Sequence, residues 1–209
     1  MCYSFNHKQT SNTMTGKLII ISAPSGSGKS TIIGALIDDP QLRLAFSVSA
    51  TTRPIRGEEV DGVNYYFMTE QQFRQEIEQG NFAEYQEVYP GRFYGTLKRE
   101  INRINESGRN VVLDVDVLGG INVKRLYGEQ AISIFIQPPS VEVLRERLIK
   151  RGTDSPEDIE NRINKAEFEM NHSDQFDHVV INDVLDVAVE QVRGLIDAFV
   201  NGDSTNEYK

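Results

Sequence analysis

The chain has 209 residues, of which 39% are hydrophobic and 25% are charged, and its formal net charge at pH 7 is −9. This length and composition are typical of one globular domain. The acidic balance disfavours a nucleic-acid or membrane partner, because either would favour a basic face. One cysteine, Cys2, excludes an internal disulfide and a cysteine-based metal cluster. No apolar run is long enough to span a membrane, so we expect a cytoplasmic protein.

The two ends of the chain are predicted to lie outside the folded part. Residues 1–16 are polar and aperiodic, which is typical of a disordered tail. The residues after Gly202 are also polar, and we expect a flexible tail at 203–209. One domain is therefore expected over residues 17–202.

A buried strand, a glycine-rich turn and a helix are predicted at the start of this domain. The apolar residues 18–21 indicate the strand, and the turn that follows contains Gly26 and Gly28. Glycines let several backbone N–H groups approach a phosphate, and the helix N-terminus behind them favours negative charge. Lys29 would meet the β- and γ-phosphate oxygens, and the hydroxyl of Ser30 would bind Mg²⁺.

This segment differs at one position from the P-loop pattern G-x-x-x-x-G-K-[ST]. Its first glycine is replaced by Ala23, which stands at the end of the predicted strand, farthest from the phosphates. An ordinary Gly/Ser turn with a chance lysine is the alternative interpretation. The strand before the turn and the helix after it favour a nucleotide-binding loop.

Turn and periodicity signals predict an alternation of strands and helices through the rest of the chain. Thr69 and Ser155 mark two helix starts, and Gly80 and Gly108 mark two helix ends. The predicted strands cover 45–49, 65–67, 82–88, 111–117, 131–136 and 178–182. The predicted helices cover 29–37, 70–79, 97–107, 141–151, 156–170 and 184–200. This alternation predicts an α/β three-layer fold with a parallel central sheet.

Two carboxylates interrupt the apolar stretch 111–117. Asp114 and Asp116 are two positions apart, so on a strand they would point to the same face. A buried strand carries two charges on one face only where a metal or a donor-rich ligand meets them. Asp114 therefore fits the acidic residue that holds the Mg²⁺ shell beside a P-loop. Two aspartates at an exposed strand end are the alternative.

A second polar group surrounds the loop after the predicted strand 45–49. Arg53 and Arg56 lie three positions apart in a hydroxyl-rich loop, and Tyr65 and Tyr94 follow farther along the chain. The guanidinium fork meets the oxygens of a phosphate monoester two at a time, and a phenol adds a donor without adding charge. This pattern favours a phosphate site, and the alternative is a solvated charged loop.

Several segments, taken in order, resemble the guanylate kinase family. Residues 51–67 read T-T-R-x-x-R-x-x-E-x-x-G-x-x-Y-x-F, which is similar to the family signature at every defined position. Further segments resemble the family's guanine-binding, acidic-strand, lid and base-contacting segments, and they lie at 82–84, 94–96, 113–116, 135–140, 147–154 and 180–183. The resemblance covers roughly residues 17–200 and is much more specific than a P-loop alone.

The resemblance implies a P-loop kinase fold with two inserted subdomains. A GMP-binding insert would span about residues 50–97, and a lid would span about 138–165. The implied activity is the ATP-dependent phosphorylation of GMP, and also dGMP, to GDP in purine nucleotide metabolism, by in-line transfer with Mg²⁺ bound as Mg-ATP. ATP and GMP would be the small-molecule partners. The sequence leaves open whether the protein is a monomer or a homo-oligomer.

The resemblance also implies roles for individual residues. The implied catalytic cations are Lys29, Arg147, Arg151 and Arg162. The implied ATP-binding residues are Ala23, Pro24, Ser25, Gly26, Ser27, Gly28, Lys29, Ser30, Thr31 and Asn182. The implied GMP-binding residues are Ser49, Arg53, Arg56, Tyr65, Glu84, Tyr94, Thr96 and Asp116. Ser30 and Asp114 would be the metal-binding residues.

The chemistry of guanine agrees with one of these assignments. Guanine presents N1–H and N2–H₂ as adjacent donors, so a single carboxylate such as Glu84 can accept from both, and we expect Glu84 to be ionised. Adenine presents a ring acceptor at N1, which a carboxylate would repel. Phosphoryl transfer needs positioning and charge stabilisation more than a general base, so no catalytic histidine is required.

Two other functions remain as alternatives. Guanylate-kinase-like domains of membrane-associated scaffold proteins resemble this fold but bind partners, and they typically lack a working P-loop. Lys29, Ser30 and Asp114 are present here and favour an enzyme. A P-loop kinase for another nucleotide, such as UMP or AMP, is the second alternative, and Glu84 with Thr96 disfavours it.

Overall fold

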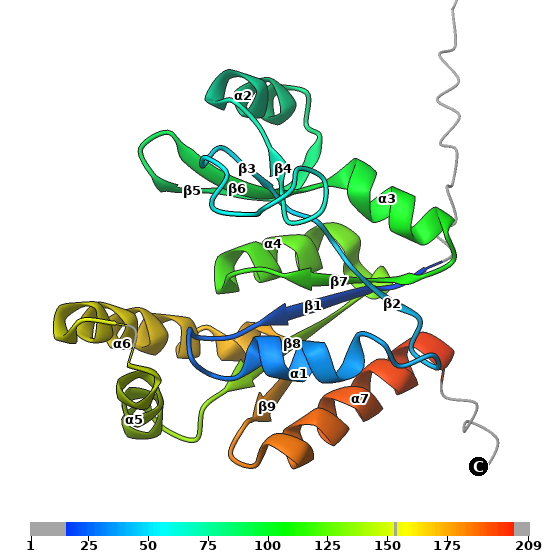
Figure 1. The fold of residues 1–209 in the computed structure, drawn as a ribbon. Helices are drawn as coiled ribbons and strands as arrows, with labels where there is room; N and C mark the ends of the chain where they lie inside the picture. Colours follow the sequence, from blue (N-terminus) through cyan, green and yellow to red (C-terminus); the bar gives the residue numbers. More distant parts are fainter. Residues whose placement is uncertain (1–15, 153, 203–209) are drawn as a thin grey trace, which may run out of the picture.

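The computed structural model describes residues 16–152 and 154–202, in which strands and helices alternate (Figure 1). The tails expected at the two ends lie outside this part, apart from Gly16, which is buried. The strands are β1 Leu18–Ser22, β2 Leu44–Phe46, β3 Ala50–Thr51, β4 Tyr66–Phe67, β5 Phe82–Tyr89, β6 Arg92–Leu97, β7 Asn110–Asp114, β8 Ala131–Gln137 and β9 His178–Ile181. The α-helices are α1 Lys29–Leu36, α2 Glu70–Glu78, α3 Lys98–Glu106, α4 Val117–Tyr127, α5 Val141–Arg151, α6 Pro156–Met170 and α7 Leu185–Asn201.

A five-stranded sheet forms the centre of the molecule, with the strand order β2-β7-β1-β8-β9. All neighbouring strands in it are parallel, and Ile20 of β1 lies opposite Leu113 of β7 and Ser133 of β8. All five residues of β1 are buried, because helices cover both faces of the sheet. This arrangement confirms the predicted three-layer α/β fold with a parallel central sheet.

The two faces of the central sheet carry separate apolar layers. On one face, Ile19 packs with Ile32 of α1 and Val192 of α7. On the other face, Ile20 packs with Ile101 of α3. The alternation of side chains along β1 explains this division, because successive residues of a strand point to opposite faces.

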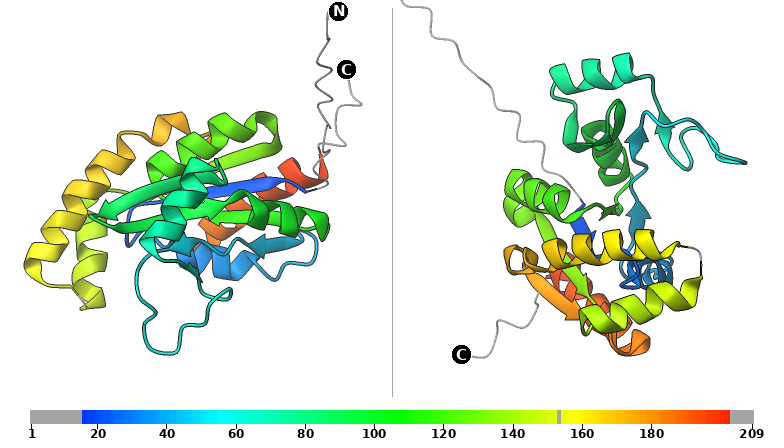
Figure 2. Two further views of the ribbon diagram at one scale, coloured as in Figure 1. Left: turned by 90° about the horizontal axis from the view of Figure 1, so that it is seen from above. Right: turned by 90° about the vertical axis from the view of Figure 1, so that its left-hand side faces the viewer.

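A second sheet lies apart from the central one (Figures 1 and 2) and has a hydrophobic core of its own. Its four strands are ordered β4-β3-β6-β5, and α2 covers it. The ring of Phe73 on α2 stacks on Phe82 and on Phe93, with centroid distances of 4.3 and 5.2 Å. Aromatic pairs of this kind bury large apolar areas, so this small sheet is stabilised without the central core.

Glu100 of α3 connects the second sheet with the central part of the molecule. Its carboxylate is buried and accepts a hydrogen bond of 2.9 Å from the phenol of Tyr66 on β4. It also accepts two hydrogen bonds of 2.8 Å from Arg103 and one of 3.4 Å from the backbone N–H of Val48. Because Val48 lies in the connection between the two sheets, this network spans the junction.

Helices α5 and α6 form a hairpin beside the central sheet (Figure 1). The buried residues of the hairpin form one cluster, which comprises Leu144, Leu148, Ile159, Ile163 and Ala166. The side chain of Ser155 accepts from the backbone N–H of Asp158 at 3.2 Å and confirms the predicted start of α6. Within residues 16–152 and 154–202, no helix has the length and apolar character needed to cross a membrane.

Two of the predicted strands are wrong in their bounds. The strand predicted at 45–49 ends at Phe46, and β3 starts only at Ala50. The strand predicted at 111–117 ends at Asp114, and α4, which the sequence analysis did not predict, starts at Val117. Asp114 and Asp116 therefore do not share one face of a strand.

A local helix cap explains the early end of β7. The carboxylate of Asp116 accepts a hydrogen bond of 2.8 Å from the backbone N–H of Gly119, which caps the first turn of α4. The hydroxyl of Ser22 donates a bond of 2.8 Å to the carbonyl of Val115 and holds the same corner. The carboxylate at 116 thus stabilises a helix start, which the strand interpretation did not consider.

Candidate active site

The glycine-rich turn between β1 and α1 has a backbone that only glycine adopts without strain. Gly26 and Gly28 have φ angles of 95° and 91°, in the left-handed region. A Cβ atom on Gly28 would lie 2.3 Å from the side-chain nitrogen of Asn182. Gly28 is also the N-cap of α1, so the turn leads the chain directly to the positive end of a helix. This geometry is that of an anion-binding loop.

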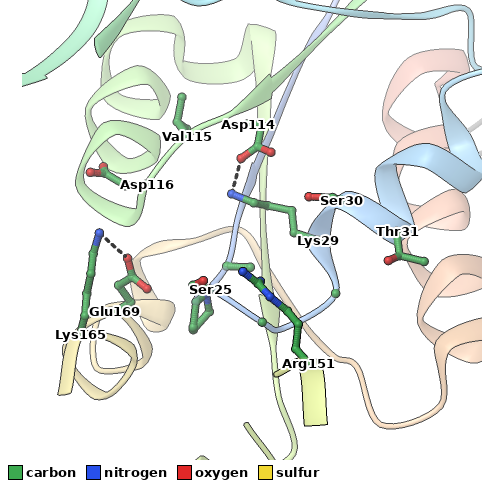
Figure 3. A pocket seen from close by; sticks show the side chains of 14 residues that line it. Ser25, Lys29, Ser30, Thr31, Asp114, Val115, Asp116, Arg151, Lys165 and Glu169 are labelled. Carbon is green, nitrogen blue, oxygen red and sulfur yellow. Dashed lines mark ion pairs between the residues drawn. The ribbon is translucent and has the colours of Figure 1, made fainter. Parts of the chain in front are cut away.

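A cavity of about 550 Å³ opens in front of this turn (Figure 3). We call it the P-loop cavity. It lies between the turn, the end of β7 and the α5–α6 hairpin. Its lining residues are Ala23, Pro24, Ser25, Gly26, Gly28, Lys29, Ser30, Thr31, Asp114, Val115, Asp116, Arg151, Lys165 and Glu169. Of the residues predicted to bind ATP, Ser27 and Asn182 are not in this lining.

Lys29 and Asp114 are in direct contact in the lining of the P-loop cavity (Figure 3). They form an ion pair in which the side chains are 17% and 30% exposed. Ser30 lines the same cavity (Figure 3). A carboxylate and a hydroxyl suit Mg²⁺, which prefers oxygen ligands and takes few of them from the protein when it binds with a nucleotide. The described part of the chain contains no group of three or more His, Cys, Asp or Glu that could hold a metal ion.

A second cavity of about 260 Å³ adjoins the first. We call it the Glu84 cavity. It shares Asp114, Val115, Asp116 and Lys165 with the P-loop cavity. Its other lining residues come from the second sheet and its connection, and they are Ser49, Tyr65, Glu84, Gln86, Val88, Tyr94 and Gly95. The structure therefore brings five predicted GMP-binding residues together, namely Ser49, Tyr65, Glu84, Tyr94 and Asp116.

Glu84 is the carboxyl group that the second sheet places at this cavity. Burial raises the pKa of its carboxyl to about 7, and the charge of Asp116 acts in the same direction. The hydroxyl of Thr96 donates a hydrogen bond of 2.7 Å to Glu84 and opposes this rise in pKa. In the ligand-free protein a pKa of about 7 leaves Glu84 partly protonated at neutral pH, whereas the expectation of an ionised Glu84 concerns the guanine-bound form. Thr96 itself is buried, so its hydrogen bond fixes the position of the Glu84 carboxyl from the protein interior.

Arg53 is engaged inside its own loop. It donates hydrogen bonds of 2.6 and 2.5 Å to the two carboxylate oxygens of Glu59, and its guanidinium lies 4.7 Å from the ring centre of Tyr65. These hydrogen bonds lower the pKa of Glu59 to about 2 and raise the pKa of Arg53. A bidentate pair of this kind fixes the geometry of both side chains.

The two loop arginines do not reach the cavities in this structure. Among the described residues that line the P-loop and Glu84 cavities, neither Arg53 nor Arg56 occurs. Arg56 is exposed, and its backbone N–H donates a hydrogen bond of 2.9 Å to Glu59. The loop that carries both arginines extends away from the body of the protein (Figure 2, residues 52–65 in light blue and cyan).

The three arginines predicted as lid cations occupy different positions. Arg151 lines the P-loop cavity. Arg162 donates a hydrogen bond of 2.5 Å to the hydroxyl of Ser25 in the glycine-rich turn and forms an ion pair of 3.1 Å with Asp154. Arg147 donates a hydrogen bond of 2.9 Å to the backbone carbonyl of Asn182. The α5–α6 hairpin is therefore in direct contact with the turn through Arg162.

Sequence reasoning missed two charged residues that line the P-loop cavity. Lys165 and Glu169 lie one helical turn apart on α6, with 3.6 Å between ammonium and carboxylate (Figure 3). Burial raises the pKa of the Glu169 carboxyl, and the positive charge of Lys165 opposes this. The spacing of four residues in the sequence indicates such a pair, but only the packing of α6 shows which face it lies on.

Comparisons with known proteins agree with this geometry. The family model described as "Guanylate kinase" matches residues 15–199. The guanylate kinase of Bacteroides thetaiotaomicron is 56% identical over 197 residues, which cover 94% of this chain and 96% of that protein. That of Porphyromonas gingivalis is 53% identical over 184 residues, covering 88% of this chain and 98% of that protein. The crystal structure of guanylate kinase from Anaplasma phagocytophilum matches with a TM-score of 0.67 and 28% identity, over 88% of this chain and 85% of that one. The chain therefore belongs to the guanylate kinase family.

Proposed function

We propose that this chain transfers the γ-phosphoryl group of ATP to GMP and releases ADP and GDP. The observation that carries the proposal is the shared wall of the two cavities. One cavity contains the glycine-rich turn, the other contains Glu84, and the segment 114–116 borders both. Two nucleotides bound in these cavities would meet at that wall, which is the arrangement that an in-line transfer between them requires.

On the donor side, the glycine-rich turn binds the phosphates of ATP. Backbone N–H groups and the start of α1 face the phosphate oxygens, and Lys29 adds a positive charge that Asp114 holds in position. Ser30 and Asp114 would hold Mg²⁺, which enters with ATP and neutralises charge on the phosphate oxygens. Asn182 supports the turn from below and does not line the cavity itself.

On the acceptor side, Glu84 reads the guanine base. Its carboxylate accepts from N1–H and N2–H₂, and binding of these donors favours the ionised form. Thr96 orients the carboxyl through its 2.7 Å hydrogen bond, and Asp116 completes the base end of the site. Ser49, Tyr65 and Tyr94 line the cavity, and together with the arginines of the loop 52–65 they are the proposed ligands of the GMP phosphate.

Arg53 and Arg56 must move inward for this role. Arg53 is held by Glu59 and by the carbonyl of Pro54 in the ligand-free protein through three hydrogen bonds, whereas its guanidinium has five in-plane N–H donors that can meet a phosphate. The GMP-binding insert at about 50–97 is the unit that we propose to move with them. The second sheet lies within this range and has a core of its own.

The lid at about 138–165 is proposed to close over the transferring group. Arg147, Arg151 and Arg162 would stabilise the charge that develops on the phosphoryl oxygens, with Lys29 on the opposite side. Closure also excludes water, which would otherwise hydrolyse ATP. Arg162 already contacts Ser25 in the glycine-rich turn, so the hairpin is placed to make this movement.

The wider setting of the reaction is part of the same proposal. We infer that the enzyme works in the cytoplasm, in purine nucleotide metabolism, and accepts dGMP beside GMP. We propose small-molecule nucleotides as its partners, with no nucleic acid and no membrane among them. The acidic net charge of −9 supports this, because the few cations have to be concentrated at the nucleotide site.

A coupled assay of ADP release tests the proposal. Purified protein is incubated with Mg-ATP and, in turn, GMP, AMP, CMP and UMP. We expect rapid ADP release only when GMP is the acceptor. Preference for AMP or UMP would establish a kinase for another nucleotide, and no turnover with any acceptor would favour the scaffold alternative. Lys29→Ala serves as the negative variant, with an expected loss of about a hundredfold or more in kcat. Lys150→Ala, an exposed change on α5, is its matched control.

A further inference from the structure

The Glu84 cavity has an unusual charge balance for a site that takes an anionic nucleotide. Three carboxylates line it, those of Glu84, Asp114 and Asp116. Lys29 neutralises Asp114 from the P-loop cavity, and among the described residues neither Glu84 nor Asp116 forms an ion pair. A nucleoside monophosphate brings up to two more negative charges. Arg53 and Arg56, which are proposed to bind the phosphate after their loop has moved, do not line the cavity in this structure. Until they arrive, like-charge repulsion opposes binding unless the lining itself supplies a cation.

Lys165 is placed to supply that cation. Of the described residues that line the Glu84 cavity, it alone carries a positive charge, and it is the one lining residue from the α5–α6 hairpin. It also lines the P-loop cavity, so its side chain lies at the boundary between the two. Its side chain is 63% exposed, which leaves the ammonium accessible to a ligand.

Glu169 holds Lys165 in this position without using all of its donors. The two charged groups are 3.6 Å apart, which is longer than a strong charge-assisted hydrogen bond. An ammonium group has three N–H donors, so the ion pair leaves donors for another acceptor. Glu169 is almost fully buried, and Figure 3 shows the two side chains pointing toward each other on the side of the cavity where Asp116 lies. The carboxylate thus anchors the lysine from the helix.

We propose that Lys165 is an additional acceptor-binding residue, whose ammonium group binds an oxygen atom of the nucleoside monophosphate while Glu169 positions it. This inference rests on the proposed function and names a residue that confers affinity for the acceptor. Because the lysine stands on the lid, its contact also couples acceptor binding to the position of α6. The donor nucleotide gains less from it, since Lys29 and Arg151 already supply positive charge in the P-loop cavity.

Steady-state kinetics of three variants test this assignment. Lys165→Gln removes the charge and leaves a polar side chain that is one atom shorter, and Lys165→Arg keeps the charge. Lys150→Gln is an exposed control on α5 that lines neither cavity. For Lys165→Gln we expect the KM for GMP to rise about five- to tenfold, with kcat and the KM for ATP changed less than about twofold. Lys165→Arg should restore most of the affinity, and Lys150→Gln should behave as the wild type.

A binding measurement separates this inference from the proposed function. The dissociation constant of GMP is measured by calorimetry in the presence of Mg-ADP, where no transfer occurs. We expect the dissociation constant of GMP to rise about five- to tenfold in Lys165→Gln. If the wild type binds GMP but does not phosphorylate it, the proposed activity fails. The ratio of the GMP dissociation constants of Lys165→Gln and the wild type still shows whether Lys165 binds the acceptor. Equal GMP affinity in the wild type and Lys165→Gln overturns the assignment, and so does an equal rise of both KM values.

Discussion

The side-chain amide of Asn182 donates a hydrogen bond of 2.7 Å to the backbone carbonyl of Ser27, across 155 positions of the sequence. This bond connects the end of β9 with the glycine-rich turn. The backbone N–H of Asn182 is itself fixed by the carbonyl of Gln137, at 2.8 Å. A loop that binds phosphate through its backbone must keep its N–H groups in place, and a buried polar contact beneath it provides this support.

Replacement of Asn182 by alanine should destabilise both the fold and the donor site. The buried carbonyl of Ser27 loses its partner, which costs about 1–3 kcal/mol of unfolding free energy. We also expect a higher KM for ATP and little change in the KM for GMP. Urea unfolding and steady-state kinetics measure the two effects. Asn161→Ala, an exposed change on α6, is the control, and a wild-type KM for ATP in Asn182→Ala would contradict the support role.

Glu84→Gln should reduce the preference for guanine. The change replaces a charge-assisted acceptor by an amide of similar volume. A hydrogen bond to a charged group is worth roughly 1.5–3 kcal/mol, so kcat/KM for GMP should fall about ten- to two-hundredfold. The KM for ATP should shift little. Values of kcat/KM for GMP, IMP and AMP in both proteins measure the effect. Glu87→Gln, which removes an exposed charge of the same strand outside both cavities, is the control. An unchanged GMP-to-AMP ratio would show that Glu84 does not read the base.

The elevated pKa of Glu84 predicts a pH dependence of stability. The pKa is raised from 4.5 in the unfolded chain to about 7 in the folded protein, so the folded state binds more protons between these values. The contribution of Glu84 to stability is therefore lost as the pH rises through this window. Relative to the wild type, the free energy of unfolding of Glu84→Gln should therefore rise by about 1–3 kcal/mol as the pH increases from about 4 to about 8. Urea titrations at several pH values check this, and a difference that does not vary with pH would contradict it.

Tyr66→Phe should weaken the junction between the two sheets. The variant keeps the ring but removes the hydroxyl that donates to the buried carboxylate of Glu100. We expect a loss of about 1–2 kcal/mol in stability, together with faster amide exchange in the second sheet. Tyr127→Phe is a suitable control, because no hydrogen bond of its phenol occurs within the described residues. Equal exchange in Tyr66→Phe and the wild type would show that this contact does not restrain the second sheet.

Closure of the two movable units should be visible by hydrogen exchange. With saturating GMP and a non-hydrolysable ATP analogue, we expect protection in about 50–95 and about 140–165 relative to the free protein. ATP analogue alone should protect the turn at Gly26 and Gly28 but not the second sheet. Unchanged exchange in both ranges at saturation would exclude the closing movement.

The segments that could be predicted from the sequence are those in which local chemistry fixes the structure. The capping box of Thr69 is an example, because its hydroxyl accepts from the N–H of Gln72 at 3.2 Å and the Gln72 side chain accepts from the Thr69 N–H at 2.8 Å. The glycine-rich turn is another, since Gly26 and Gly28 are needed for its backbone. In both cases the residues that determine the structure lie within a few positions of one another.

Helix α4 could not be predicted in this way, because distant contacts decide it. Two adjacent glycines, Gly119 and Gly120, lower its helix propensity. A Cβ atom on Gly120 would lie 2.9 Å from the hydroxyl of Ser22, and one on Gly119 would lie 3.1 Å from the carboxylate of Glu84. The glycines are thus required by close packing against β1 and the second sheet. The same limit applies to Lys165, whose place at the site depends on how α6 packs.

The aromatic core around Phe73 shares no described residue with the two clusters that pack on the central sheet. The chain passes between the two parts at residues 47–49 and again after Leu97. Substitutions on the exposed part of β5 can therefore change what the second sheet recognises, while the phosphate-binding half keeps its packing. Acceptor specificity can therefore evolve separately from ATP binding. The same phosphate-binding half can serve a new acceptor, or the second sheet can come to bind a partner without catalysis.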